Sequence, residues 1–173
     1  MGISGLEIFS TGFTGSFDLI GADGGVLASM RYRSSFGRKG KLEISGLNYE
    51  IKHTKWYSSD TIVKLHGRDI ALVDASGAGS SIVKYLDGSY PDMRISSTKF
   101  GWRNFSYRVS SSGLPNLDIT VGYNFWKLRY TYRTDNPEKL NDSNITPLQL
   151  ALAIHAIRAD IMVRQAYAAS MGG

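Results

Sequence analysis

The chain of 173 residues is long enough for one domain with a sizeable core, and 42% of its residues are hydrophobic. It contains no cysteine, which excludes disulfide bonds, cysteine zinc sites and thiol nucleophiles. Its 20 basic and 15 acidic residues give a formal net charge of +5, which favours an anionic partner. Residues 1–6 lack the basic and apolar regions of a secretory signal, so we expect a cytoplasmic protein.

Short strands bounded by turn residues are predicted from about residue 5 to residue 134, a pattern typical of an antiparallel meander. The clearest hairpin turns at Asp23-Gly24-Gly25, because glycine accepts the positive φ that a tight turn needs. A second turn is expected at residues 66–69, between two apolar arms. Residues 76–93 are rich in glycine and serine, so they predict a loop with a short structured piece near residues 82–86.

Residues 124–133, NFWKLRYTYR, alternate between two chemical characters, and successive side chains of a strand point to opposite faces. The apolar residues of one face are Trp126, Leu128, Tyr130 and Tyr132. The basic residues of the other face are Lys127, Arg129 and Arg133. The apolar positions are odd before residue 126 and even after it, so we expect a bulge or tight turn near Gly122–Asn124.

A helix is predicted over residues 146–170, with Thr146 as N-cap and Pro147 at the first helical position. Its polar residues are scattered around the helical wheel: Gln149, His155, Arg158, Asp160 and Arg164. A helix that is apolar on nearly all sides must be enclosed, and the run Leu150–Ile157 is too short to cross a bilayer. We therefore predict an all-β protein with one long helix, a single domain over residues 1–173 in which a closed antiparallel barrel surrounds the hydrophobic C-terminal helix.

Two stretches are rich in basic residues: residues 94–133 contain one acid, Asp118, and residues 31–41 contain none. The outer faces of strands in these stretches are predicted to bind an anion. The candidate residues are Lys127, Arg129, Arg133, Arg103, Arg108, Arg31, Arg33, Arg38, Lys39 and Lys41. The alternative interpretation is that these residues only keep the outer faces of the strands solvated.

Catalytic and metal-binding motifs are missing from the sequence. His53, His66 and His155 lie in three segments without metal-ligand spacing, and GRKGKL at residues 37–42 lacks the glycine and the hydroxyl residue of a phosphate loop. No nucleophile is paired with a base, so we expect no enzyme, cofactor or metal. Nucleic acid is also disfavoured, because stacking aromatics and cations should share a face whereas here they alternate.

Three segments resemble the superfamily of tubby C-terminal domains, LURP-one proteins and phospholipid scramblases: residues 15–30, 57–73 and 146–162. The third is the most specific, with a Pro-Leu start, an Ala/Leu/Ile run and Asp160 in the acidic place, although His155 and Arg158 make it more polar than the family helix. The resemblance implies a closed barrel threaded by this helix. Tubby-like members bind phosphoinositides through basic residues outside the barrel, which implies peripheral contact with an anionic membrane. The alternative is a structural or protein-interaction domain without a small-molecule ligand.

Overall fold

The computed structural model describes residues 7–11, 14–34, 38–56, 58–75, 79–101, 103–124, 129–135, 140 and 144–171. Within them, twelve antiparallel strands form one sheet in which each strand pairs with its neighbours in sequence. The strands are β1 (Glu7–Thr11), β2 (Ser16–Ile20), β3 (Val26–Tyr32), β4 (Gly40–Ile44), β5 (Leu47–His53), β6 (Thr61–Leu65), β7 (Arg68–Ala75), β8 (Ser80–Tyr85), β9 (Met93–Phe100), β10 (Asn104–Ser111), β11 (Leu114–Asn124) and β12 (Arg129–Thr134). The long helix is α2 (Pro147–Met171).

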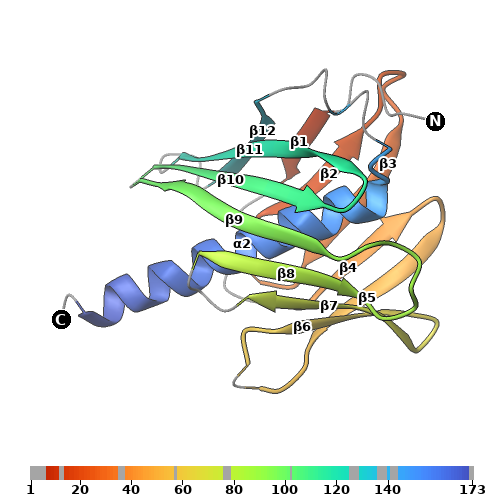
Figure 1. Cartoon of the computed structure of the whole chain (residues 1–173), viewed down its shortest axis with the longest axis horizontal. Coiled ribbons are helices and arrows are strands. Elements are labelled where there is room, and N and C mark those ends of the chain that lie inside the picture. Colours follow the sequence, from red (N-terminus) through yellow and green to blue (C-terminus); the bar gives the residue numbers. More distant parts are fainter. Residues whose placement is uncertain are drawn as a thin grey trace.

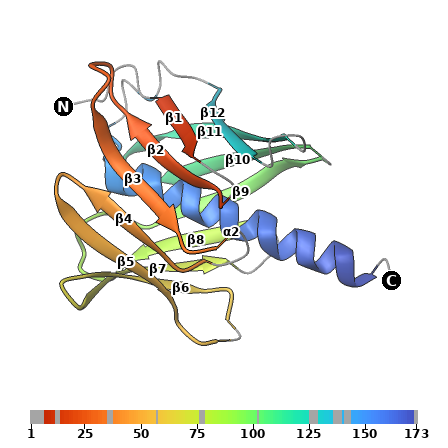
Figure 2. The same ribbon diagram turned by 180° about the vertical axis from the view of Figure 1, so that it is seen from behind.

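The sheet curls into a nearly closed barrel around α2, as predicted from the sequence (Figures 1 and 2). The first and last strands, β1 and β12, contact each other, although the described residues form no hydrogen-bonded ladder between them. The helix is buried from Leu148 to Ile161, and its last turns project beyond the strands. The barrel interior is therefore filled by helix side chains.

The predicted alternation and turns are present in the sheet. Along β4, buried and exposed residues alternate without interruption, with Leu42 and Ile44 facing α2. The hairpin between β2 and β3 turns at residues 21–25, and its Gly24 has a φ of 78°. His66 and Gly67 both have positive φ and form the two-residue turn between β6 and β7. Residues 80–85 form the full strand β8, a longer element than the short piece predicted within a loop.

The change of apolar phase near residue 126 coincides with a change of strand. β11 and β12 pair in a register that places Val121 opposite Tyr132, so odd residues of β11 share the barrel interior with even residues of β12. β11 stays regular through Asn124, so the change of phase lies after the predicted position at Gly122–Asn124. Residues 125–128, which include Trp126, Lys127 and Leu128, lie outside the described residues.

The start of α2 has the predicted cap. Thr146 Oγ1 accepts a hydrogen bond from the Gln149 backbone N–H at 3.3 Å, and the Thr146 N–H donates to Gln149 Oε1 at 3.0 Å. These reciprocal bonds satisfy two backbone donors that a helix start leaves without intrahelical partners. Residue choice at positions 146–149 thus places the first turn of the helix.

Polar groups on the buried part of α2 are hydrogen-bonded to the barrel wall. His155 bonds through Nδ1 to the Tyr32 hydroxyl and through Nε2 to the Thr61 hydroxyl, each at 2.9 Å. Asp160 accepts from the Tyr107 hydroxyl at 2.8 Å. Arg158 lies over the Tyr32 ring, with its Cζ 3.8 Å from the ring centroid. The polar residues Gln149, His155, Arg158 and Asp160 are thus enclosed together with the apolar residues of the buried part of α2.

Candidate anion-binding groove

The two ends of the barrel differ, because α2 leaves the barrel at only one of them. In an antiparallel meander the connections after odd-numbered strands all lie at one end. α2 contacts these connections: Arg158 Nη2 donates to the carbonyl oxygen of Thr14 at 2.8 Å, and the Arg164 guanidinium lies over the ring of Phe100, the last residue of β9. We call this end the helix-exit end; it is where the C-terminus projects in Figure 2.

A groove of about 670 Å³ opens on the outer wall of β4 and β5 next to the helix-exit end. It is lined by five basic residues, with His53, Trp56 and one acid, Glu50, among the other described lining residues. The basic lining residues are Arg33, Lys39, Lys41, Lys52 and Lys55. We call this site the basic groove.

Strand register brings three cations into one row across the basic groove. The Arg33 N–H donates to the Lys39 carbonyl at 3.1 Å and so extends the β3–β4 ladder by one pair. The β4–β5 register, which pairs Lys41 with Glu50, continues to place Lys39 next to Lys52. Side chains of directly opposite residues stand about 5 Å apart, and like charges at that spacing repel each other. At Lys52 this repulsion is reduced by the ion pair with Glu50 on the same strand.

Two lining residues of the basic groove, Glu50 and His53, have lowered pKa values. Glu50 is ion-paired with Lys52, and Lys52, Lys41 and Arg33 together hold the pKa of Glu50 below its usual range. His53 donates from Nδ1 to the Ser58 carbonyl at 3.2 Å. Burial, together with the charges of Arg38 and Lys39, lowers the pKa of His53 despite that bond. The hydrogen bond from Lys52 is the largest cause of the Glu50 shift and burial the largest cause of the His53 shift, and nearby positive charge adds to both.

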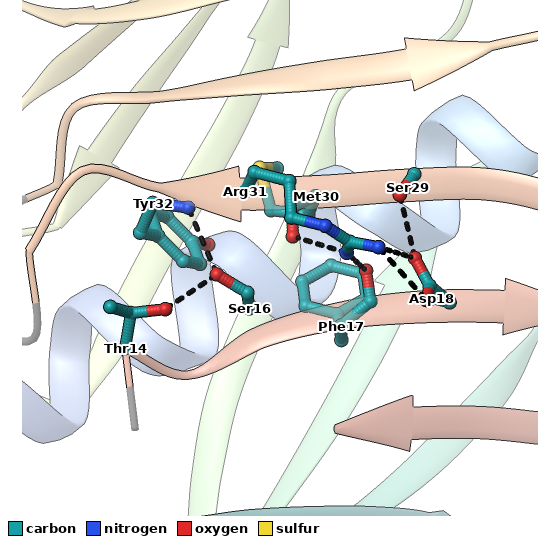
Figure 3. Close-up of polar contacts among 8 residues, drawn as sticks. All are labelled: Thr14, Ser16, Phe17, Asp18, Ser29, Met30, Arg31 and Tyr32. Atoms are coloured by element: carbon teal, nitrogen blue, oxygen red, sulfur yellow. Dashed lines mark hydrogen bonds and ion pairs between the residues drawn. The ribbon is translucent and has the colours of Figure 1, made fainter. Parts of the chain in front are cut away.

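Two other predicted residues of the first basic stretch have different surroundings. Arg31 forms an ion pair with Asp18 on β2, with Nη2 and Oδ1 2.8 Å apart, and its Nη1 donates to the Phe17 and Met30 carbonyls (Figure 3). Ser29 donates to the same carboxylate at 2.6 Å. Arg38 is partly buried, and burial and the charge of Arg158 lower its pKa. Neither arginine lines the basic groove.

The described arginines of the second basic stretch differ in their surroundings. Arg108 is held by Asp118 through two hydrogen bonds of 2.7 and 3.1 Å. Arg103 and Arg133 line a shallower hollow of about 430 Å³ on β10–β12. Arg129 and Arg133 are exposed on β12 and border a second groove of about 560 Å³ between β1 and β12. Lys127, the remaining predicted residue, lies outside the described residues.

Sequence reasoning missed Lys52, Lys55 and Trp56, which line the basic groove with the predicted Arg33, Lys39 and Lys41. The signal was present in EIKHTKWY at residues 50–57, where lysines occur just after a predicted strand. Glu43 and Glu50 separate these lysines from the basic stretch that ends at Lys41. In the structure Glu50 is neutralised by its ion pair with Lys52.

The described residues contain no group of three His, Cys, Asp or Glu side chains that could hold a metal ion. The basic groove presents cations from the paired strands β4 and β5, and cations of this kind bind anions by charge and hydrogen bonds. Comparison with known proteins adds no identity: no protein-family model matches the chain, and neither a curated protein nor a solved structure matches it.

Proposed function

We propose that this protein is a non-enzymatic binding module whose basic groove holds a phosphorylated anion, such as a phosphoinositide headgroup or another polyanion. The observation that supports this function best is the row of Arg33, Lys39 and Lys52 across three neighbouring strands. Arg33 and Lys39 gain no stability from each other at cross-strand distance. Lys52 beside them is ion-paired with Glu50, so the two charges that have no ion pair among the described residues favour a role in binding.

The chemistry of the groove fits a phosphate ester. Arginine donates two parallel hydrogen bonds to phosphate oxygens, and lysine contributes a compact charge that adjusts to the ligand. A volume of about 670 Å³ is within the usual range of small-molecule sites. The groove lies on paired strands, so its cations are presented by a wall that does not have to fold when the ligand binds.

The fold supports a relationship with the tubby, LURP-one and scramblase superfamily, and we include membership in the proposal. A nearly closed twelve-stranded barrel around a C-terminal helix is compatible with that family. The second candidate function is a structural or protein-interaction domain without a small ligand. It is favoured by the ion pairs of Arg31 with Asp18 and of Arg108 with Asp118, which show that some cations stabilise the wall.

Isothermal titration calorimetry with inositol 1,4,5-trisphosphate tests the proposal. The groove variant carries Arg33→Gln, Lys39→Gln and Lys41→Gln. Its matched control carries Arg68→Gln, Lys84→Gln and Arg94→Gln, three exposed cations outside the groove with the same total charge change. Hydrogen bonds to charged groups contribute about 1 kcal/mol or more each, so we expect the groove variant to bind roughly 100-fold more weakly and the control nearly as well as the wild type.

Equal weakening in both variants would show that net charge alone attracts the ligand, and it would reject the groove as a site. Failure of the wild-type protein to bind inositol trisphosphate, inositol hexakisphosphate or heparin would favour the interaction domain instead. Circular dichroism of each variant confirms that folding is unchanged.

A further inference from the structure

The described strand connections at the two ends of the barrel differ in charge. At the helix-exit end, the described residues of the strand connections include five bases and one acid, Asp60. These bases are Arg33, Arg38, Lys39, Lys55 and Arg103. At the other end, the described connections and Asp135 after β12 contain four acids and neither lysine nor arginine. These acids are Asp23, Asp87, Asp92 and Asp135. The described connections are thus basic at the helix-exit end and acidic at the other end, where the exposed strand cations Arg68, Lys84 and Arg94 also lie.

The basic end also exposes aromatic and apolar side chains. Trp56, in the connection between β5 and β6, is 91% exposed. Tyr167 and Met171 are 64% and 86% exposed on the part of α2 that projects from the barrel. This projecting tail, residues 165–171, has no charged residue. The large exposed hydrophobics of the opposite end, Val26, Leu47 and Leu86, are aliphatic and lie near the acidic turns.

We infer that the helix-exit end docks onto an anionic membrane surface, with Trp56 and the projecting tail of α2 entering the headgroup region. Tryptophan and tyrosine favour the membrane–water interface, and nearby lysines and arginines are attracted to acidic lipids. The seven tail residues are about 10 Å long, so they reach the headgroup region and not across the bilayer. The described helix does not combine the length and hydropathy of a membrane span, so a peripheral contact is the appropriate geometry.

Charge polarity favours a membrane over other occupants. A large acidic surface attracts the basic end and repels the acidic end, so it fixes the orientation of the whole barrel. Trp56 and the tail belong to separate elements, and lysines lie next to Trp56. The core of a protein–protein interface is depleted of charged residues, so this mixture suits a lipid headgroup region better. This inference rests on the proposed function for the headgroup, because the basic groove opens beside this end.

Vesicle sedimentation tests the docking geometry with phosphatidylcholine vesicles, with and without 20% phosphatidylserine. The tail variant carries Tyr167→Ser and Met171→Ser, and its control carries Val26→Ser and Leu47→Ser at the acidic end. We expect the tail variant to bind acidic vesicles about tenfold more weakly and still to bind inositol trisphosphate like the wild type. We expect the control to bind both like the wild type. Lipids brominated near the headgroup should quench wild-type fluorescence more than that of Trp56→Phe.

Several results would overturn the docking model. Equal vesicle binding by the tail variant and the wild type, or unchanged quenching in Trp56→Phe, would remove these contacts from the interface. Inositol trisphosphate binding without vesicle binding would preserve the proposed function and reject docking. A concentration-dependent dimer in analytical ultracentrifugation that the tail variant abolishes, without vesicle binding, would assign this end to a second copy. If only the groove variant lost both inositol trisphosphate and vesicle binding, while the tail variant kept both, the result would support the proposed function and reject the docking contacts of the tail.

Discussion

Replacing Leu152 with alanine should measure how completely the barrel encloses α2. Leu152 is fully buried, and every residue of α2 from Leu148 to Ile161 is buried with it. Truncation loses the transfer free energy of the side chain and leaves a cavity that the surrounding wall closes only in part. Because a closed wall of paired strands relaxes little, we expect a loss near the upper part of the usual range, about 4 kcal/mol. For a protein of this length that corresponds to a fall in Tm of about 8–16 °C.

Urea unfolding followed by circular dichroism measures this loss directly, with Tyr167→Ala as the control on the same helix. Tyr167 is largely exposed on the projecting tail, so the control should change the free energy of unfolding by less than about 0.5 kcal/mol. A loss below about 1 kcal/mol for Leu152→Ala would refute the enclosed helix, since it would mean that Leu152 contacts water or a loose wall. The comparison requires that the dependence of the unfolding free energy on urea concentration, the m value, is the same in both variants and the wild type.

Gly79→Ala should lower the urea midpoint more than Gly24→Ala does. Both glycines have positive φ, which strains an alanine at either position. Only at Gly79 would the new Cβ also lie 2.0 Å from Arg164 Nη2. Burial and the charge of Arg158 lower the pKa of His155 to about 3 from 6.5, so the unfolded chain binds more protons and stability should fall as pH drops below about 6.5. His155→Gln should reduce that pH dependence in thermal melts; an unchanged slope would contradict the buried neutral imidazole. Inositol trisphosphate binding in calorimetry should survive the triple variant Lys127→Gln, Arg129→Gln and Arg133→Gln. A large loss of binding would move the site to the second basic stretch.

Local sequence patterns determined the elements and the class of fold. Alternating side chains and turn glycines such as Gly24 predict strands and hairpins, because strand period and positive φ are properties of a few adjacent residues. The Thr146-Pro147 start predicts where α2 begins for the same reason. Enclosure of the helix was predictable as well. Apolar residues occur on nearly all sides of the helix and its few polar residues do not share a face, so no side is suited to water.

The candidate site was decided by tertiary structure, because charge in a sheet is shared across strands. Arg33 and Lys52 are 19 positions apart in sequence, and only the β3–β4–β5 register puts both beside Lys39. The same long-range pairing neutralises Arg31 with Asp18 on β2, although the sequence predicted Arg31 to be part of the anion site. The direction in which α2 passes through the barrel is likewise a global property, and it places Tyr167 at the basic end. Residue spacing along one strand contains none of this information, because each contact depends on the pairing of distant strands.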